Sequence, residues 1–158
     1  DHDIDVCYDV SKKTFEHVFR ELNSQHIFLE GIVLKPNMVI SGMSCSNQAS
    51  VEEVADRTVE CLRETVPPEV PGCAFLSGGQ TNEDASAHLN MMNAKYAHNL
   101  EWHLTFSYGR ALQASALLAW AGKSENISSA QDAFYHRAKF NGLATTGNYS
   151  ENLEMEIA

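Results

Sequence analysis

The feature that most constrains the fold is an alternation of short apolar strands with longer amphipathic helices. Segments rich in Val, Ile, Leu and Phe lie at residues 27–39, 73–76 and 102–108, and helical periodicity follows each of them. Strands separated by whole helices pair in parallel, through right-handed crossovers. The sequence therefore predicts an α/β fold, either a small open parallel sheet or an arc of a (β/α)₈ barrel.

Capping residues and helix breakers mark the ends of the predicted helices. A first helix begins near Ser11, and Ser50 and Thr81 are typical N-caps for the second and third. A fourth helix is expected to stop at Gly122, and a fifth to cover residues 126–140. The buried face of that last helix is expected to comprise Ile127, Ala130, Phe134 and Ala138.

Composition narrows the classes of partner. The 158 residues are 44% hydrophobic, which suffices for one core, and the formal net charge is −10. Such an acidic balance disfavours nucleic acids and anionic membrane surfaces, although it permits a local basic pocket for a small phosphate ester. No apolar run reaches the roughly 18 residues of a membrane span. The seven histidines form no ligand motif, and we expect no metal site.

Polar and glycine residues follow each predicted strand. Lys35 ends the first, Ser77-Gly78-Gly79 follow the second, and residues 107–110 (Ser-Tyr-Gly-Arg) follow the third. The carboxyl ends of neighbouring parallel strands lie at one rim, where α/β proteins bind ligands. We therefore expect these three segments to form one site.

Lys35 is a candidate nucleophile. An amine held at an apolar strand end is poorly solvated, which favours the neutral form that attacks a carbonyl to give a Schiff base. The alternative is a lysine that simply reaches solvent at the end of a strand.

The two glycine-containing segments are a candidate phosphate site. Backbone N–H groups at Gly78 and Gly79 can form an anion nest beside the Ser77 hydroxyl. Arg110 opens a helix, whose N-terminus favours an anion, and its guanidinium can grip phosphate. Each segment alone is also compatible with an ordinary turn.

These same stretches resemble class I (Schiff-base) fructose-bisphosphate aldolases. The matching segments are LEGIVLKPNMV at 29–39, TVPPEVPGCAFLSGGQ at 65–80, LTFSYGRALQASALLAW at 104–120 and KSENISSAQDAF at 123–134. The similarity runs almost from Asp1 to about Tyr149. It implies that residues 1–149 are the C-terminal part of a (β/α)₈ barrel, strands six to eight. Independently of the resemblance, Glu151, Glu154 and Glu156 predict that residues 150–158 are a polar, acidic and mobile tail.

The resemblance also implies a reaction and a set of site residues. The family cleaves fructose 1,6-bisphosphate reversibly to dihydroxyacetone phosphate and glyceraldehyde 3-phosphate in glycolysis, without a metal or other cofactor. Lys35 aligns with its Schiff-base lysine. The residues implied to bind a substrate phosphate are Ser77, Gly78, Gly79, Ser107, Gly109 and Arg110. Family members are usually homotetramers in the cytosol or a plastid.

One departure from the family pattern concerns catalysis. The proton-transfer groups of the family, an aspartate, further lysines and a glutamate on the first five strands, have no counterpart in this chain. We therefore expect a fragment of an aldolase that is inactive by itself. The alternatives are a non-catalytic remnant that binds phosphosugars and another Schiff-base barrel that acts on a different phosphosugar.

Overall fold

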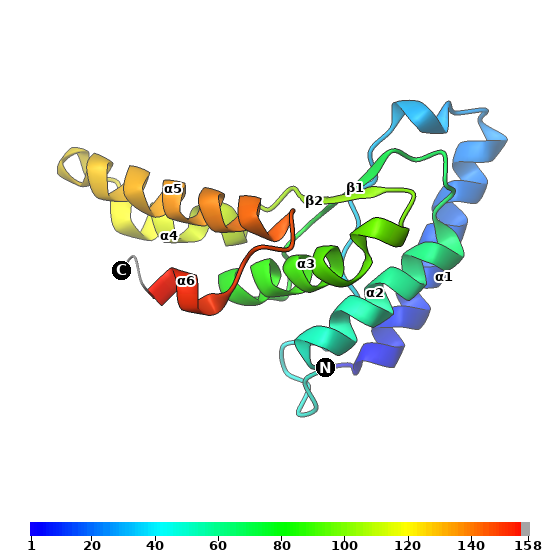
Figure 1. Ribbon diagram of the computed structural model, residues 1–158, viewed down its shortest axis with the longest axis horizontal. Coiled ribbons are helices and arrows are strands. Elements are labelled where there is room, and N and C mark those ends of the chain that lie inside the picture. Colours follow the sequence, from blue (N-terminus) through cyan, green and yellow to red (C-terminus); the bar gives the residue numbers. More distant parts are fainter. Residues whose placement is uncertain (156–158) are drawn as a thin grey trace.

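The computed structural model describes residues 1–155 (Figure 1). Its helices are α1 (Ile4–Ser24), α2 (Val51–Thr65), α3 (Asn82–Tyr96), α4 (Arg110–Trp120), α5 (Ile127–Ala144) and α6 (Glu151–Met155). Its strands are β1 (Gly72–Phe75) and β2 (His103–Phe106). Three 3₁₀ turns complete the chain: η1 (Leu29–Gly31), η2 (Ala97–Asn99) and η3 (Ser124–Asn126).

The two strands are parallel, as predicted. Cys73 lies opposite Leu104 and Phe75 opposite Phe106, and α3 connects the strands. Cys73, Phe75 and Leu104 are buried, because this face of the sheet packs against the helices. The α/β class is therefore confirmed.

The prediction of a strand that begins in the apolar run at Ile27 and ends at Lys35-Pro36 is wrong in its extent. The first part forms the turn η1, and only Leu34 joins the sheet. The Leu34 N–H donates to Gly72 O (3.1 Å), and the Ala74 N–H donates back to Leu34 O (2.8 Å). The next donor toward β1 would be the N–H of Pro36, which proline lacks. The segment therefore runs beside β1 without a continuous ladder.

The predicted caps of α2 and α3 are confirmed. The Ser50 hydroxyl accepts from the Glu53 N–H (3.2 Å), and the Thr81 hydroxyl accepts from the Asp84 N–H (3.0 Å). Each cap satisfies one of the backbone donors that a helix leaves free at its N-terminus.

Helix α1 begins earlier than predicted, at Ile4 rather than near Ser11. Asp3 is its N-cap, and the carboxylate accepts from the Val6 N–H (2.9 Å). Ile4 and Tyr8 extend the buried stripe toward the N-terminus. Asp3 thus serves helix capping, whereas Asp5 pairs with Arg57 of α2 (2.7 Å).

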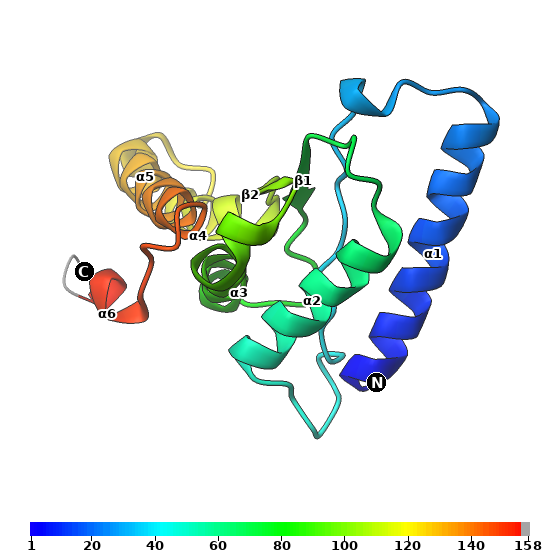
Figure 2. The same ribbon diagram turned by 45° about the vertical axis from the view of Figure 1, so that its right-hand side comes forward.

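The helices follow one another along one side of the strands. Helices α1, α2 and α3 lie side by side, and the α4–α5 pair continues the row beyond α3 (Figures 1 and 2). Among residues 1–155, no helix is both long enough and apolar enough to cross a membrane.

The predicted inner face of the last helix is wrong. Ile127 and Phe134 are 49% and 42% exposed. The buried residues of α5 are instead Arg137, Phe140, Asn141 and Ala144. The reason is visible in Figure 1: the first half of α5 extends past α3 with only α4 alongside, and the second half packs on α3.

Part of the predicted tail has a defined structure. Residues 151–155 form α6, in which Glu154 contacts α5 through Arg137 (2.6 Å). Residues 156–158 of the predicted tail lie outside the described residues.

Candidate functional site

The loop after β1 and the start of α4 lie in contact, as the strand-end prediction requires. The Ser77 hydroxyl, in a side chain that is 4% exposed, accepts from the Ala111 N–H at the start of α4 (3.3 Å). A Cβ on Gly78 would lie 3.5 Å from the Arg110 guanidinium. The structure therefore brings together Ser77, Gly78 and Arg110.

Two of the glycines in this loop occupy positions that disfavour a side chain, each for its own steric reason. Gly79 has φ +79°, a left-handed conformation that glycine adopts without strain. A Cβ on Gly78 would also approach Leu76 to 3.2 Å, on the side where Arg110 lies. The absence of side chains leaves the backbone accessible to a small anion.

The Ser107–Arg110 turn is anchored by its second residue. Tyr108 is buried, and its hydroxyl donates to Ala85 O of α3 (2.7 Å). Burial raises the pKa of this hydroxyl, which therefore stays protonated. Ser107, Gly109 and Arg110 remain exposed around it. The anchor fixes the turn while leaving its polar groups available to a ligand.

The register of the strands determines the face of the sheet on which Lys35 lies. Leu34 pairs with Cys73, and Cys73 with Leu104, on the face toward the helices. Side chains alternate along extended chain, so Lys35 lies on the other face, as does Ser107 at the end of β2. Both are exposed. Residues 1–155 therefore do not bury Lys35 in the poorly solvated environment that the sequence predicts.

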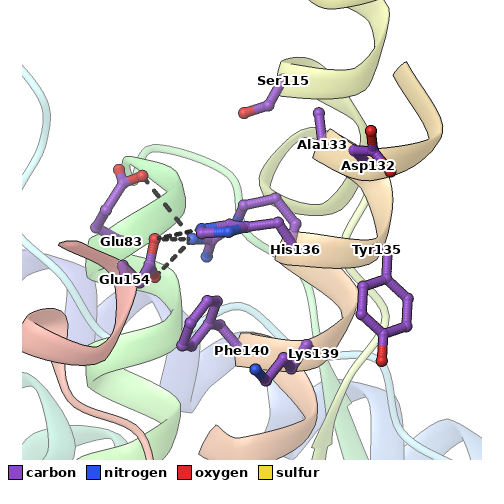
Figure 3. A pocket seen from close by; sticks show the side chains of 10 residues that line it. Glu83, Ser115, Asp132, Ala133, Tyr135, His136, Lys139, Phe140 and Glu154 are labelled. Atoms are coloured by element: carbon purple, nitrogen blue, oxygen red, sulfur yellow. Dashed lines mark hydrogen bonds and ion pairs between the residues drawn. The ribbon is translucent and has the colours of Figure 1, made fainter. Parts of the chain in front are cut away.

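Apart from the strand-end residues, a hollow of about 480 Å³ lies between α3, α5 and α6 (Figure 3). Arg137, 2% exposed, donates to both carboxylate oxygens of Glu154 (2.6 and 2.7 Å). Glu83 lies 3.9 Å from the guanidinium, and His136 lies 3.4 Å from Glu154. None of the predicted site residues lines this hollow, and its buried charge is paired within the chain.

The sequence patterns did not single out Arg137 or His88, which are buried polar residues. Arg137 also donates to Ser86 Oγ (2.6 Å) and Asn82 O (2.8 Å) of α3. His88 lies on the same stripe of α3 as Ala85 and Leu89. The sequence offered the same signal for both residues: a polar residue at a position where the helical spacing predicts an apolar one.

Residues 1–155 contain no group of three or more His, Cys, Asp or Glu side chains that could hold a metal ion. The predicted site residues offer an amine, a guanidinium, hydroxyls and backbone amides.

These features define an α/β protein with parallel βα units and a glycine-containing loop at its strand ends. The comparisons go further. The family model for glycolytic class-I fructose-bisphosphate aldolase matches residues 1–158, and the chain belongs to this family.

Two relatives show the extent of the similarity. The chain is 52% identical over 149 residues to fructose-bisphosphate aldolase B of Sparus aurata, which covers 94% of this chain and 41% of the relative. It is also 52% identical over 149 residues to a probable class 1 fructose-bisphosphate aldolase of Xanthomonas axonopodis pv. citri. That match covers 94% of this chain and 44% of the relative. The chain thus spans less than half the length of these relatives.

A solved structure shows the same fold. It is fructose-bisphosphate aldolase from Plasmodium falciparum, in a complex with TRAP and a small-molecule inhibitor. The TM-score is 0.89 at 48% identity, over 94% of this chain and 42% of the solved one.

Proposed function

We propose that this chain supplies the Schiff-base lysine and one phosphate site of a class I fructose-bisphosphate aldolase, as strands six to eight of its (β/α)₈ barrel. The observation that carries the proposal is the contact between the Gly78 loop and Arg110, in a chain of this family. Lys35 lies on the adjacent segment, directly after Leu34, which forms the bridge to Cys73 of β1.

In the proposed reaction, Lys35 is the nucleophile. Its neutral amine attacks the ketone carbon of fructose 1,6-bisphosphate, and loss of water gives a protonated imine. The imine accepts the electron pair of the C3–C4 bond while the C4 hydroxyl gives its proton to a base outside this chain, so that glyceraldehyde 3-phosphate leaves and an enamine remains. Protonation of the enamine carbon and hydrolysis of the imine then release dihydroxyacetone phosphate and restore the amine.

The phosphate contacts orient the substrate for this attack. The Arg110 guanidinium can donate two parallel hydrogen bonds to a phosphate, and the N-terminus of α4 adds its free amides and dipole. Gly78, Gly79 and Gly109 leave the backbone open, and Ser107 adds a hydroxyl. Ser77 holds the loop against α4 through Ala111. A fixed phosphate brings the carbonyl to Lys35 in a reactive orientation.

The resemblance to the family carries the rest of the proposal. The working enzyme is a homotetramer in the cytosol or a plastid. Its proton-transfer groups come from the part of the relatives' length that this chain does not span, and residues 1–158 alone are inactive. The competing function is a phosphosugar-binding remnant without turnover.

Turnover separates the two functions. In the full-length protein that contains this chain, Lys35→Arg should lower cleavage of fructose 1,6-bisphosphate by a factor on the order of 10⁴, because the guanidinium keeps the charge but forms no imine. Lys123→Arg, an exposed residue before η3, is the matched control and should keep full activity. A wild-type protein that binds the bisphosphate without cleaving it would support the remnant instead.

A further inference from the structure

The Gly78–Gly79 loop is held at both ends by side-chain hydrogen bonds. At its start, Ser77 is bonded to Ala111 of α4. At its end, the amide oxygen of Gln80 lies 2.7 Å from Nδ1 of His88, the seventh residue of α3. The two glycines between these attachments have no side chains of their own with which to fix their orientation.

His88 can act as a permanent donor in this pair. It is 7% exposed, and burial lowers its pKa to about 4, a shift that the nearby Asp84 carboxylate partly opposes. The imidazole is therefore neutral at physiological pH. With its hydrogen on Nδ1, it donates to the Gln80 amide oxygen.

Packing behind the loop does not replace this bond. A hollow of about 190 Å³ lies beside Gly79 and Gln80, between the 40–51 segment and α3. The Gln80 side-chain nitrogen is buried and has no partner among residues 1–155. The hydrogen bond to His88 thus attaches the Gln80 side chain itself to α3, one residue before the Thr81 cap.

We propose that His88 is a positioning residue for phosphate recognition. Through Gln80 it fixes the direction in which the backbone amides of Gly78 and Gly79 point, so that they converge with Arg110 on one phosphate group. The inference rests on the proposed function, and it extends that function to a residue of α3 that does not itself reach the ligand.

The test compares a ligand with and without the phosphate. In the full-length protein, borohydride trapping is measured against the concentration of dihydroxyacetone phosphate and, separately, of dihydroxyacetone. His88→Leu removes the donor and should raise the half-saturating concentration of dihydroxyacetone phosphate about tenfold, the effect of one lost hydrogen bond. Trapping of dihydroxyacetone should not change. His88→Asn, which keeps a side-chain donor, should recover most of the loss.

Gln80→Ala provides a second variant that leaves the core of α3 intact. It should cause the same phosphate-specific loss as His88→Leu, whether or not that variant folds. Equal weakening of both ligands, or no weakening in Gln80→Ala, would overturn the inference. A wild-type protein that traps neither ligand would instead contradict the proposed function.

Discussion

At the scale of residues, the buried imidazole of His88 links the strand-end loop to pH. In an unfolded chain its pKa is the ordinary 6.5, whereas burial lowers the folded value to about 4. Between these values the unfolded state binds more protons than the folded state, so stability falls as the pH falls. Asp84 is the charged group that opposes the shift.

Replacing His88 by Asn should remove this dependence, because asparagine does not titrate. Relative to the variant, the wild-type full-length protein should lose about 3 kcal/mol of unfolding free energy between pH 7 and pH 4. Denaturant unfolding at several pH values measures the difference. Parallel pH profiles for the two proteins would show that the imidazole is not buried as described.

Single residues also decide what could be predicted from the sequence. Gly78, Gly79 and Arg110 follow strands, and parallel pairing was enough to predict that they meet. Lys35-Pro36 was predicted as the end of a strand, and the missing N–H of Pro36 leaves a gap between the two bonds of Leu34 and the bond from the Leu76 N–H to Pro36 O (3.0 Å). The partner of His88 depends on how the loop turns back onto α3, which periodicity does not contain.

At the scale of elements, Arg137 joins four helices. Its guanidinium contacts α3 through Ser86, α4 through Ala111 O (3.3 Å) and α6 through Glu154. Burial, the largest single influence, raises the pKa of Glu154, but the hydrogen bonds and charge of Arg137, together with the other neighbouring groups, outweigh it, and the net shift is downward. The ion pair thus helps to hold α6 on the helix layer, where Leu153 also packs against the core (Figure 3).

Glu154→Gln should loosen α6, because it leaves the buried Arg137 without its counter-charge. We expect a loss of about 3 kcal/mol of stability and faster hydrogen exchange over residues 151–155. Glu151→Gln, an exposed change in the same helix, is the matched control. If both variants behave alike in thermal unfolding and exchange, the ion pair does not anchor the helix.

The elements were predictable where local signals agree. The caps at Ser50 and Thr81 were sufficient to start α2 and α3 correctly. The face of α5 was not, because Ile127 and Phe134 have helical spacing but no element beyond α4 packs on that half. Which face of α5 is buried depends on how far α3 extends alongside it, and this is a property of the tertiary structure.

At the scale of the whole molecule, the strands are covered on one face only. The helices bury the side of Cys73 and Leu104, whereas Val33, on the other face, is 61% exposed and Lys35 is also exposed. Parallel strands are normally buried on both faces. The chain spans 41% and 44% of the lengths of the two relatives.

The proposed account depends most on the chemistry of Lys35 in the full-length protein. The direct measurement is borohydride reduction in the presence of dihydroxyacetone phosphate, followed by peptide mapping. The account predicts a single adduct at Lys35, with the mass of dihydroxyacetone phosphate less one oxygen, and no adduct in Lys35→Arg. An unmodified Lys35 under saturating ligand, or an adduct confined to another lysine, would contradict the Schiff-base assignment.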